Sequence, residues 1–446
     1  MFNTHLILDH DEKRSTTTSS RARAWIVSAS IGLSFVLGQA ALGQSQLYTV
    51  TDLGTLESAE ICPCFFGDAI NEFGHVTGHY FDPSGTYRAF YWADGTMIDL
   101  GTLGGDLAFS HSLNGLNTIV GRSRIDEEGT AEHAFLYSDG AMIDLGTLGG
   151  THSYAFDINN AGLVVGNSQR PEPEYYHHAY VWEAGAMTDL GTLGGAFSSA
   201  SSINDAGEIV GSAWNSASKD RAFLWTAADG MLELGDLGGE RSEALNINIL
   251  GQIVGSSHTD EIEKTLFVPF THAFLWQDGV MYDLGALPEA GEEGPYGPEL
   301  VHTAAKSINA VGQIVGNSWP ASNSSPRQGP FIYEEGQMMN LNDLLLIGST
   351  GWEIFQANDI NNFGQIAGTA KFDAGPYHAV RLDPVAVIPS DLVVDGQVGA
   401  ADLAVLLGSW GPCDSEEDCP ADLDGDQAVG AADLAILLGS WGPYSA

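Results

Sequence analysis

Residues 189–225 read DLGTLGGAFSSASSINDAGEIVGSAWNSASKDRAFLW, and this stretch decides the fold because the chain repeats it. A repeat of about 45 residues that alternates apolar and polar positions is typical of a small β-sheet, which cannot bury both faces without neighbours. Clear copies of the opening DLGTLGG begin at Asp99, Asp144 and Asp189, and weaker copies begin at Asp52, Glu233 and Asp283.

Each copy contains a hairpin with an N-x-x-G turn. Glycine and asparagine tolerate the left-handed backbone that such a turn requires. The turns begin at Asn71, Asn114, Asn159, Asn204, Asn248, Asn309 and Asn361, and the one at Asn114 ends in Asn117 instead of glycine. These turns predict seven repeats.

A second hairpin follows in each copy, so that each repeat has four short strands. Its first strand resembles HAFLW and begins at Arg88, His133, His178, Arg221, His272, Gly329 or His378. Its second strand has the form x-M-x-D-L-G, which the last repeat lacks and which LYTVTDLG (Leu47–Gly54) supplies at the other end of the chain. The sequence therefore predicts an all-β, seven-bladed β-propeller over residues 44–384, closed by an N-terminal strand. An open solenoid is the alternative.

The motifs DLGTLGG, I-N-x-x-G-x-I-V-G and H-A-F-L-W resemble those of the extracellular HAF-repeat family across nearly all of Asp52 to Leu382. The resemblance implies export and a repeat architecture. It brings no established reaction with it.

The composition predicts an exported, acidic protein. There are 16 Lys and Arg residues against 58 Asp and Glu, a net charge of −42, which disfavours nucleic acid and favours cations as partners. Basic residues, an apolar run from Ala24 to Leu37 and the small residues Ala41-Leu42-Gly43 indicate a bacterial signal peptide over residues 1–43, with an uncleaved membrane anchor as the alternative. No later segment is long and apolar enough to span a membrane, so we expect a secreted or cell-surface location.

The His or Arg that opens the third strand and the Asp of D-L-G recur in almost every repeat. A catalytic group occurs once in a fold, whereas a residue present in every blade usually stabilises the blade. We therefore interpret these residues as a structural hydrogen-bond network, for example between His and Asp.

Two insertions are better candidates for a ligand site, because loops on a rigid scaffold carry most binding residues. The first spans His258 to Thr271 and the second Leu287 to His302. Carboxylates beside a His and a Tyr can perform acid and base chemistry on a sugar, although such mixtures are more often solvated loops. The candidates are Asp260, Glu261, Glu263, Glu289, Glu292, Glu293, Tyr296 and His302.

After a linker at residues 385–390 the chain carries a duplication, residues 391–446, whose halves begin at Asp391 and Asp422. Each half is an acidic loop followed by a short helix that Gly408 or Gly439 ends. The loop spacing matches EF-type calcium ligands at positions 1, 3, 5, 7 and 12. The predicted ligands are Asp422, Asp424, Asp426, Ala428 and Asp433 in the second loop and Asp391, Asp395, Gln397 and Asp402 in the first, where Val393 occupies position three. The favourable glycine at position six is Gly396 in the first loop and is replaced by Gln427 in the second.

This duplication resembles a dockerin, the loop-helix module of secreted bacterial proteins. The resemblance implies calcium-dependent folding and docking to a cohesin-like partner. The positions that read the partner are here Ala400, Ala401, Ala431 and Ala432, without the hydroxyl pair of cellulosomal dockerins, so an anchoring or sorting tag that binds a cell-surface protein fits equally well.

Two pairs of cysteines are spaced closely enough to form local bonds. Cys413 and Cys419 lie between the two halves of the duplication, and in an exported protein we expect a disulfide there, with two exposed thiols as the alternative. Cys62 and Cys64 can pair with each other under strain or with an external thiol.

Together these features favour a non-catalytic repeat protein. In this hypothesis the propeller is a binding or structural scaffold, held at an extracellular site by its calcium module. The alternative is a carbohydrate-active enzyme, a polysaccharide hydrolase or lyase, on the same scaffold.

Overall fold

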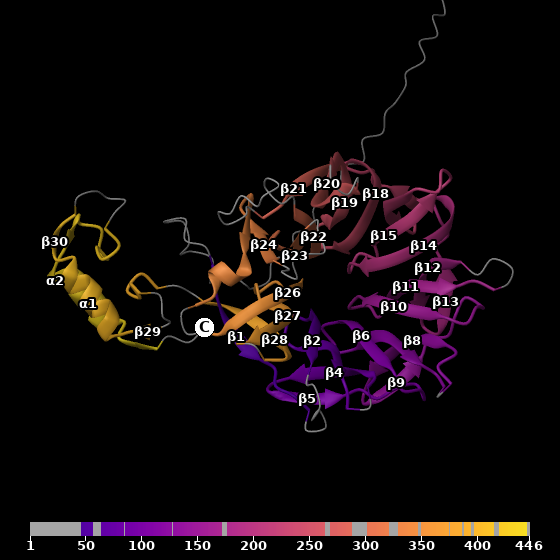
Figure 1. Cartoon of the computed structure of the whole chain (residues 1–446), viewed down its shortest axis with the longest axis horizontal. Helices are drawn as coiled ribbons and strands as arrows, with labels where there is room; N and C mark the ends of the chain where they lie inside the picture. The colour runs from indigo at the N-terminus through magenta and orange to yellow at the C-terminus, as the bar shows by residue number, and fades with distance from the viewer. Residues whose placement is uncertain are drawn as a thin grey trace, which may run out of the picture. The chain divides into compact units, whose positions relative to one another are not determined.

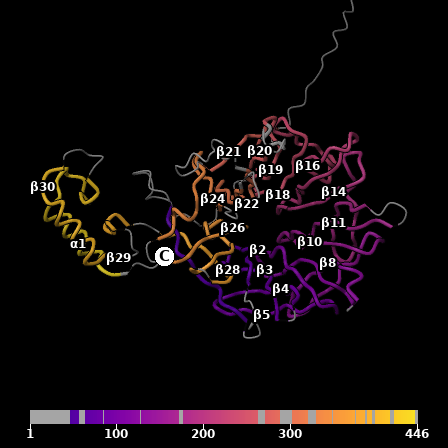
Figure 2. Tube along the Cα trace, in the orientation of Figure 1, coloured from indigo at the N-terminus to yellow at the C-terminus, as the bar shows by residue number. Residues whose placement is uncertain are grey.

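The structure is a computed structural model that describes residues 46–56, 64–83, 85–126, 128–171, 176–263, 268–287, 301–320, 329–346, 349–373, 375–385, 388–393, 397–413 and 419–443. Within these ranges, seven four-stranded antiparallel sheets are arranged around a common centre (Figure 1). The Cα trace in Figure 2 shows the same ring of blades. The predicted seven-bladed β-propeller is confirmed.

The first four blades follow one another along the chain. Blade 1 contains β2 (Phe65–Ile70), β3 (Val76–Phe81), β4 (Tyr87–Ala93) and β5 (Thr96–Asp99). Blade 2 contains β6 (Ala108–Leu113), β7 (Ile119–Arg124), β8 (Glu132–Ser138) and β9 (Ala141–Asp144). Blade 3 contains β10 (Ser153–Ile158), β11 (Val164–Gln169), β12 (His177–Glu183) and β13 (Ala186–Asp189). Blade 4 contains β14 (Gly194–Ile203), β15 (Ile209–Asn215), β16 (Asp220–Thr226) and β17 (Gly230–Glu233).

The last three blades complete the ring. Blade 5 contains β18 (Gly238–Ile247), β19 (Ile253–Glu263), β20 (Val268–Gln277) and β21 (Val280–Gly285). Blade 6 contains β22 (Val301–Ile308), β23 (Ile314–Pro320), β24 (Gly329–Glu334) and β25 (Gln337–Asn340), and the 3-10 helix η1 (Leu341–Leu344) follows it. Blade 7 contains β26 (Trp352–Ile360), β27 (Ile366–Phe372), β28 (Tyr377–Val385) and β1 (Leu47–Asp52).

The N-terminal strand β1 closes the ring as the outer strand of blade 7. It pairs antiparallel with β28, with Val50 opposite Leu382 and Asp52 opposite Val380 (Figure 1). Strand β28 runs to Val385, one residue into the segment predicted as a linker. The expected closure is thus confirmed and the open solenoid is wrong, because β1 covers the edge that β28 would otherwise leave unpaired.

The hydrophobic core is divided among the interfaces between blades. One cluster joins Val165 and Ala179 of blade 3 to Ile203, Ile209 and Phe223 of blade 4, and all five side chains are buried. Equivalent clusters lie between the other neighbours. A blade therefore buries its apolar faces only against the blades beside it.

The asparagines of the N-x-x-G turns form a closed ring of hydrogen bonds. The side-chain Nδ2 of each one donates to the backbone carbonyl of its counterpart in the next blade over 2.9–3.1 Å, and Asn361 of blade 7 returns the series to Asn71 of blade 1. Each Oδ1 accepts two backbone N–H groups of its own turn, as Asn204 does from Ala206 and Glu208. The fourth residue of the turn has positive φ, which is 59° at Asn117, the residue that replaces glycine.

The C-terminal segment contains two helices of equal length, α1 (Ala400–Gly408) and α2 (Ala431–Gly439). Two short ladders link the halves, since β29 (Gln397–Val398) pairs with β32 (Gly442–Pro443) and β30 (Gly411–Pro412) pairs with β31 (Ala428–Val429). Leu406 and Leu437 are buried in a shared small core. Both helices end at the predicted glycines.

The predicted signal peptide, residues 1–43, lies outside the described residues. No helix in the described part of the chain is long and apolar enough to cross a membrane.

The closing strand provides a first test of the fold. Tyr48 is fully buried in β1, and its hydroxyl has no hydrogen-bond partner among the described residues. Tyr48→Phe removes this unsatisfied group, so we expect the free energy of unfolding to rise by about 1 kcal/mol. Tyr48→Ala leaves a cavity and should lower it by about 3–5 kcal/mol. Urea unfolding of both variants measures these changes, and a loss of stability in Tyr48→Phe would contradict the assignment.

The asparagine ring provides a second test with a matched control. Asn215, at the turn between β15 and β16, accepts the N–H groups of Ala217 and Lys219, much as Asn204 accepts two N–H groups of its own turn. Among the described residues, however, the Asn215 side chain makes no hydrogen bond to another blade. Asn204→Ala should therefore destabilise the propeller by about 1–3 kcal/mol more than Asn215→Ala, because it also leaves the buried carbonyl of Asn248 without its donor. Equal unfolding midpoints in urea would show that the bond between blades contributes nothing.

Candidate functional site

The inner strand of every blade contains a β-bulge at the same place. In β2, for example, Gly67 pairs with Gly78 and Ala69 with Thr77, so Asp68 between them has no partner in the ladder. The other inner strands repeat this register shift three residues before the turn asparagine. The residues left unpaired are Asp68, His111, Phe156, Ser201, Leu245, Lys306 and Asn358, and we call them the bulge ring.

All seven residues of the bulge ring line one cavity at the centre of the propeller. Its volume is about 150 Å³, which is the size of a cavity that holds a single benzene-sized ring. A β-bulge redirects a side chain, and here it places one residue from each blade in the cavity wall. The seven residues are all different, whereas the positions around them repeat from blade to blade.

The residues that follow the bulge link neighbouring blades. Asp157 accepts hydrogen bonds from the hydroxyl groups of Ser112 at 2.7 Å and Ser202 at 2.8 Å, and from the N–H of Ile203 at 2.9 Å. Its side chain therefore holds three blades together. This use of both oxygens leaves little capacity for chemistry on a substrate.

Asp359 does the same between blades 6, 7 and 1. Its carboxylate accepts from Ser307 Oγ at 2.6 Å and from Ile70 N at 2.9 Å. Asn246 takes this place in blade 5, where Oδ1 accepts from Ile308 N at 3.2 Å and Nδ2 donates to Ser202 Oγ at 3.4 Å. An amide can thus replace the carboxylate at this position.

Loss of water and the charge of Asp157 raise the pKa of Asp359 to about 6. Desolvation also raises the pKa of Asp157. A carboxyl group whose pKa is higher in the folded chain than in the unfolded chain holds a proton in the fold that it releases on unfolding. Its contribution to stability therefore falls as the pH rises from about 4 to about 6.

Two groups of the bulge ring have polar atoms without partners. The Nε2 atom of His111 is buried and makes no hydrogen bond to a described residue. Desolvation, with the nearby charges of Arg122 and His79, lowers the pKa of His111 to about 3, so the imidazole is neutral at ordinary pH. The side chain of Lys306 lines the cavity, and its ammonium group forms no ion pair within the described ranges.

An arc of aromatic rings lies beside the cavity, toward the end opposite the asparagine turns. Its members come from blades 7, 1, 2 and 3, and neighbouring ring centroids lie 4.8–5.8 Å apart from blade 7 to blade 2. We call this set the aromatic arc: Phe355, Tyr377, Phe66, His79, Phe109 and Tyr154. Blades 4, 5 and 6 carry Ser199, Glu243 and Ala304 at the position of Phe66, so the arc covers one side only.

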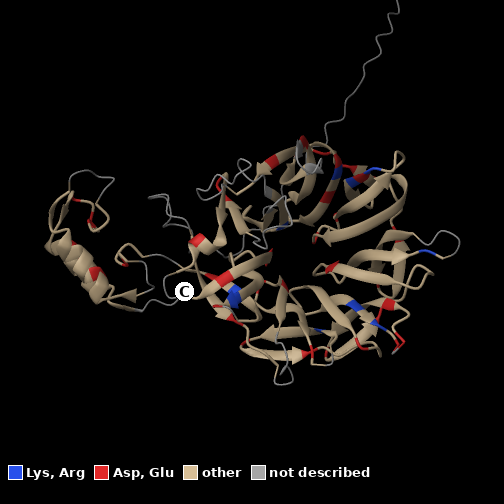
Figure 3. Ribbon diagram, in the orientation of Figure 1, with Lys and Arg blue, Asp and Glu red and all other residues tan. Residues whose placement is uncertain are grey.

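Two basic side chains lie on the arc. The guanidinium of Arg122 is 4.7 Å from the ring centre of Phe109 and 5.2 Å from that of Tyr154, and it bridges blades 2 and 3. The ammonium of Lys371 is 4.1 Å from the ring centre of Tyr377. Figure 3 shows how few basic residues the propeller has among its many acidic ones, which makes their presence here notable.

The repeated His, Arg and Asp residues form the predicted structural network. His133 Nδ1 lies 2.9 Å from Asp144, and the same Asp accepts from the N–H of Gly146 at 2.7 Å. Equivalent pairs are His178 with Asp189, His272 with Asp283, His378 with Asp52, Arg88 with Asp99 and Arg221 with Glu233. These groups join the third strand to the fourth and take no part in the cavity.

The described residues cover only part of the two insertions, so their role as ligand loops stays a prediction. The segment from His258 to Thr271 was expected to be irregular, but it lengthens β19 and β20 into a hairpin in which Glu263 pairs with Val268, and Asp260 and Glu261 are exposed on it. His302 is buried in β22, stacks on Trp319 and accepts the N–H of Thr271 at 3.0 Å. Glu289, Glu292, Glu293 and Tyr296 lie outside the described residues, as does Cys62, so the pairing of Cys62 with Cys64 stays a prediction.

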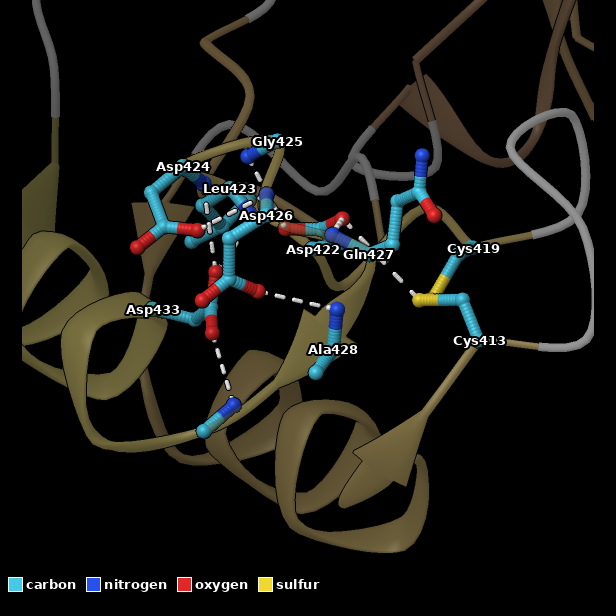
Figure 4. Close-up of a disulfide and its surroundings, with 11 residues drawn as sticks. Cys413, Cys419, Asp422, Leu423, Asp424, Gly425, Asp426, Gln427, Ala428 and Asp433 are labelled. Atoms are coloured by element: carbon cyan, nitrogen blue, oxygen red, sulfur yellow. Dashed lines mark hydrogen bonds between the residues drawn. A yellow bond between two sulfur atoms is a disulfide. The ribbon is translucent and has the colours of Figure 1, made fainter.

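The second C-terminal loop brings three of its predicted ligands together. Asp422, Asp424 and Asp426 each offer an oxygen within 4.8 Å of the others (Figure 4). Partial desolvation and the charges of Asp426, Asp433 and Asp422 raise the pKa of Asp424. Uncompensated hard oxygen ligands of this kind suit a divalent cation.

The remaining predicted ligands are placed as follows. Asp433 is buried and accepts the backbone N–H groups of Leu423 at 2.6 Å and Gly430 at 2.6 Å (Figure 4). In the first loop Asp402 accepts from Val393 and Gly399 in the same way, and Asp391 is buried. Ala428 and Gln397 begin β31 and β29, while Asp395 and Gly396 lie outside the described residues. Gln427, which replaces the favoured glycine, has a φ of 70°.

The predicted disulfide between Cys413 and Cys419 is present, and their Cα atoms are 5.7 Å apart (Figure 4). It closes the connection between the two halves of the duplication. A disulfide is compatible with an exported protein.

The central cavity was missed at the sequence level, although the sequence contains a signal for it. The position three residues before each turn asparagine holds Asp, His, Phe, Ser, Leu, Lys or Asn, while the isoleucine or leucine two residues later hardly varies. A position that differs in every copy of a regular repeat is free of the structural role that fixes its neighbours. Alignment of the seven repeats on their asparagines would have identified it.

No protein-family model matches the sequence, and no curated protein sequence matches it. Among solved structures, the chain is similar to a puromycin-hydrolysing peptidase of Mycobacterium tuberculosis, with 10% identity and a TM-score of 0.44 over 78% of this chain and 58% of that one. It is similar to the β-propeller domain of the Trilobed protease from Pyrococcus furiosus, described as having an open velcro topology, with 12% identity and a TM-score of 0.40 over 73% and 86% of the chains. It is also similar to TolB from Acinetobacter baumannii, with 10% identity and a TM-score of 0.40 over 70% and 64%. The chain thus spans less than two thirds of the peptidase and of TolB.

The carboxyl group of Asp359 gives a prediction about pH. In Asp359→Asn the amide can make the same hydrogen bonds as Asn246. The substitution also removes the free-energy cost of a charged carboxylate in the cavity lining. Above pH 6 we expect the free energy of unfolding to rise by about 1–3 kcal/mol relative to the unchanged protein, and at pH 4 the difference should vanish. Urea unfolding at pH 4 and pH 7 measures it. Asp94→Asn, at a side chain that is 95% exposed, is the control, and an equal change at both pH values would contradict the prediction.

Proposed function

We propose that this chain is an exported, non-catalytic binding protein with a dockerin-like tag and HAF-type repeats. Its propeller binds a small ligand or the end of a longer one in the central cavity. The observation that carries this proposal is the bulge ring, where seven equivalent positions with seven different side chains surround one cavity. A purely structural ring has no need of such variety.

We further propose that the C-terminal module binds calcium through the loop at Asp422, Asp424 and Asp426. The three carboxylates fit a hard divalent cation, and the chain has no Lys or Arg after Val385 to neutralise them. Asp433 and Asp402 hold the loops against the helices through backbone N–H groups. When bound, calcium would supply positive charge to a cluster that otherwise repels itself.

The module is proposed to attach the propeller to a cohesin-like or cell-surface protein outside the cell. Its support is an apolar surface that occurs twice, once in each half. Leu407 and Trp410 in the first half, and Leu438 and Trp441 in the second, are 48–52% exposed. Exposed tryptophans and leucines at matching positions are typical of a surface that a partner covers.

A carbohydrate-active enzyme is the second candidate, and the pKa of Asp359 near 6 is the observation in its favour, since a general acid works best near the ambient pH. Against it, both oxygens of Asp359 and of Asp157 accept hydrogen bonds from neighbouring blades. We therefore expect no polysaccharide cleavage from these two residues. Reducing-end assays on the proteins with Asp359 and Asp359→Asn test this point.

Calcium titration tests the function of the module. In the exported chain, residues 44–446, we expect calcium to raise the unfolding temperature of the module, and a concentration of 100 times Kd corresponds to about 2.7 kcal/mol of stabilisation. Calorimetry reports it. The double variant Asp422→Ala/Asp426→Ala should lose the effect, whereas Asp229→Ala, an exposed propeller residue, should keep it. No binding below millimolar calcium would refute the module's role.

A further inference from the structure

The residues that line the central cavity are partly polar and partly apolar, and each comes from a different blade. Phe156 in blade 3 and Leu245 in blade 5 are apolar, while Asp68, Lys306 and Asn358 offer charges and an amide. A ligand that fits must therefore combine an apolar face with several hydrogen-bonding groups. The inference drawn here rests on the proposed binding function and concerns the chemistry of the ligand.

Several polar groups of the ring lack a partner within the protein. His111 Nε2 is buried without a hydrogen bond, whereas Lys306 is an exposed residue of the cavity lining and has no ion pair among the described residues. Asn358 uses Nδ2 on the carbonyl of Gly67 at 2.8 Å, so its Oδ1 is available to accept. A ligand that supplies hydroxyl groups can hydrogen-bond the Lys306 ammonium and the Asn358 Oδ1 atom in place of water.

The charges of the cavity exclude two ligand classes. Asp68, Asp157 and Asp359 line it together, so a polyanion would meet carboxylates that repel it. A wholly apolar ligand would displace water from the ammonium of Lys306 without giving it a partner. The cavity volume of about 150 Å³ suits one ring-sized unit.

A sugar ring meets these requirements. One face of a pyranose carries C–H groups that pack on an aromatic ring, and its edge carries hydroxyl groups that both donate and accept hydrogen bonds. Phe156 lies 5.5 Å from His111 between ring centres, so an apolar surface and a hydrogen-bonding nitrogen lie side by side. A free amino acid would also bind Lys306 through its carboxylate, but Asp68 is already paired with His79 Nδ1 at 2.6 Å, and a free amino acid has no use for the aromatic surface outside the cavity.

That surface is the aromatic arc, and it is continuous with the cavity. His111 stacks on Phe109 at 6.5 Å, and Phe109 belongs to the arc. The rings of the arc are partly exposed, and they extend across four of the seven blades. A polymer of rings can therefore place one unit in the cavity and further units on the arc.

We propose that the bulge ring is a saccharide-binding site that holds one pyranose unit of a polysaccharide, with adjoining units on the aromatic arc. Phe156 packs on the C–H face of the sugar. Asn358 Oδ1 and the ammonium of Lys306 bind its hydroxyl groups. No bond is made or broken in this step.

Isothermal titration of the exported chain tests the proposal with three uncharged hexasaccharides as probes: cellohexaose, xylohexaose and mannohexaose. At least one should bind, and the hexamer should bind more tightly than its monosaccharide because the arc contributes. Phe156→Ala and Lys306→Met should each weaken binding about tenfold or more. Unfolding curves confirm that both variants fold.

Matched controls use the same changes away from the cavity. Phe363→Ala alters a phenylalanine that is 68% exposed in a turn of blade 7, and Lys219→Met alters a lysine paired with Glu240. Neither residue lines the cavity, so saccharide affinity should be unchanged. Affinity that falls equally in variants and controls would overturn the site.

Free amino acids and a hexapeptide, titrated in parallel, separate this proposal from the function on which it rests. If the amino acids or the hexapeptide bind in a way that depends on Phe156, and no saccharide binds at 10 mM, the proposed saccharide class is wrong. The propeller would then still be a ligand-binding protein. Binding of neither probe class would overturn the ligand-binding function of the propeller as well. Saccharide binding that survives Phe156→Ala and Lys306→Met would place the site elsewhere and refute the inference.

Discussion

The closed ring of asparagine side chains is the interaction on which the rest of the propeller depends. Each side chain stabilises its own turn through Oδ1 and the next blade through Nδ2, and the series returns to its start at Asn71. Because the ring is closed, one blade cannot tilt without straining its bonds to both neighbours. This constraint explains why the asparagine is present in all seven repeats even where the glycine of the turn is lost.

The position of each turn asparagine also determines the roles of the two residues before it. The residue before it is buried in the interface between blades, as Ile203 and Ile360 are, and the one before that links blades in six of the seven cases through a hydroxyl, amide or carboxylate. The bulged residue is the first position in the inner strand that these contacts do not fix, although Asn358 still joins blade 7 to blade 1 through the carbonyl of Gly67. Variation can accumulate there without cost to the fold, which is why the bulge ring is where function can be built.

Many charged side chains of the propeller are held by specific partners. The aspartates of the outer strands are held by His or Arg and by backbone N–H groups, as Asp144 is by His133 and Gly146. Asp157 and Asp359, in the lining of the central cavity, hold blades together. Their burial and mutual repulsion raise the pKa of Asp359. Arg122 and Lys371 lie instead on aromatic rings beside the cavity, where cation–π contacts stabilise them.

The sequence by itself determined the number of blades, the four strands of each, the closing role of Leu47 to Asp52 and the disulfide between Cys413 and Cys419. These features depend on contacts that are local or that repeat, and repetition makes them visible in a single chain. Only the tertiary structure decided that Asp68, His111, Phe156 and Lys306 meet, because the ring joins residues that are one or more repeats apart in the chain. It also showed that the insertion after His258 extends a hairpin, since cross-strand pairing of Glu263 with Val268 has no signature in composition.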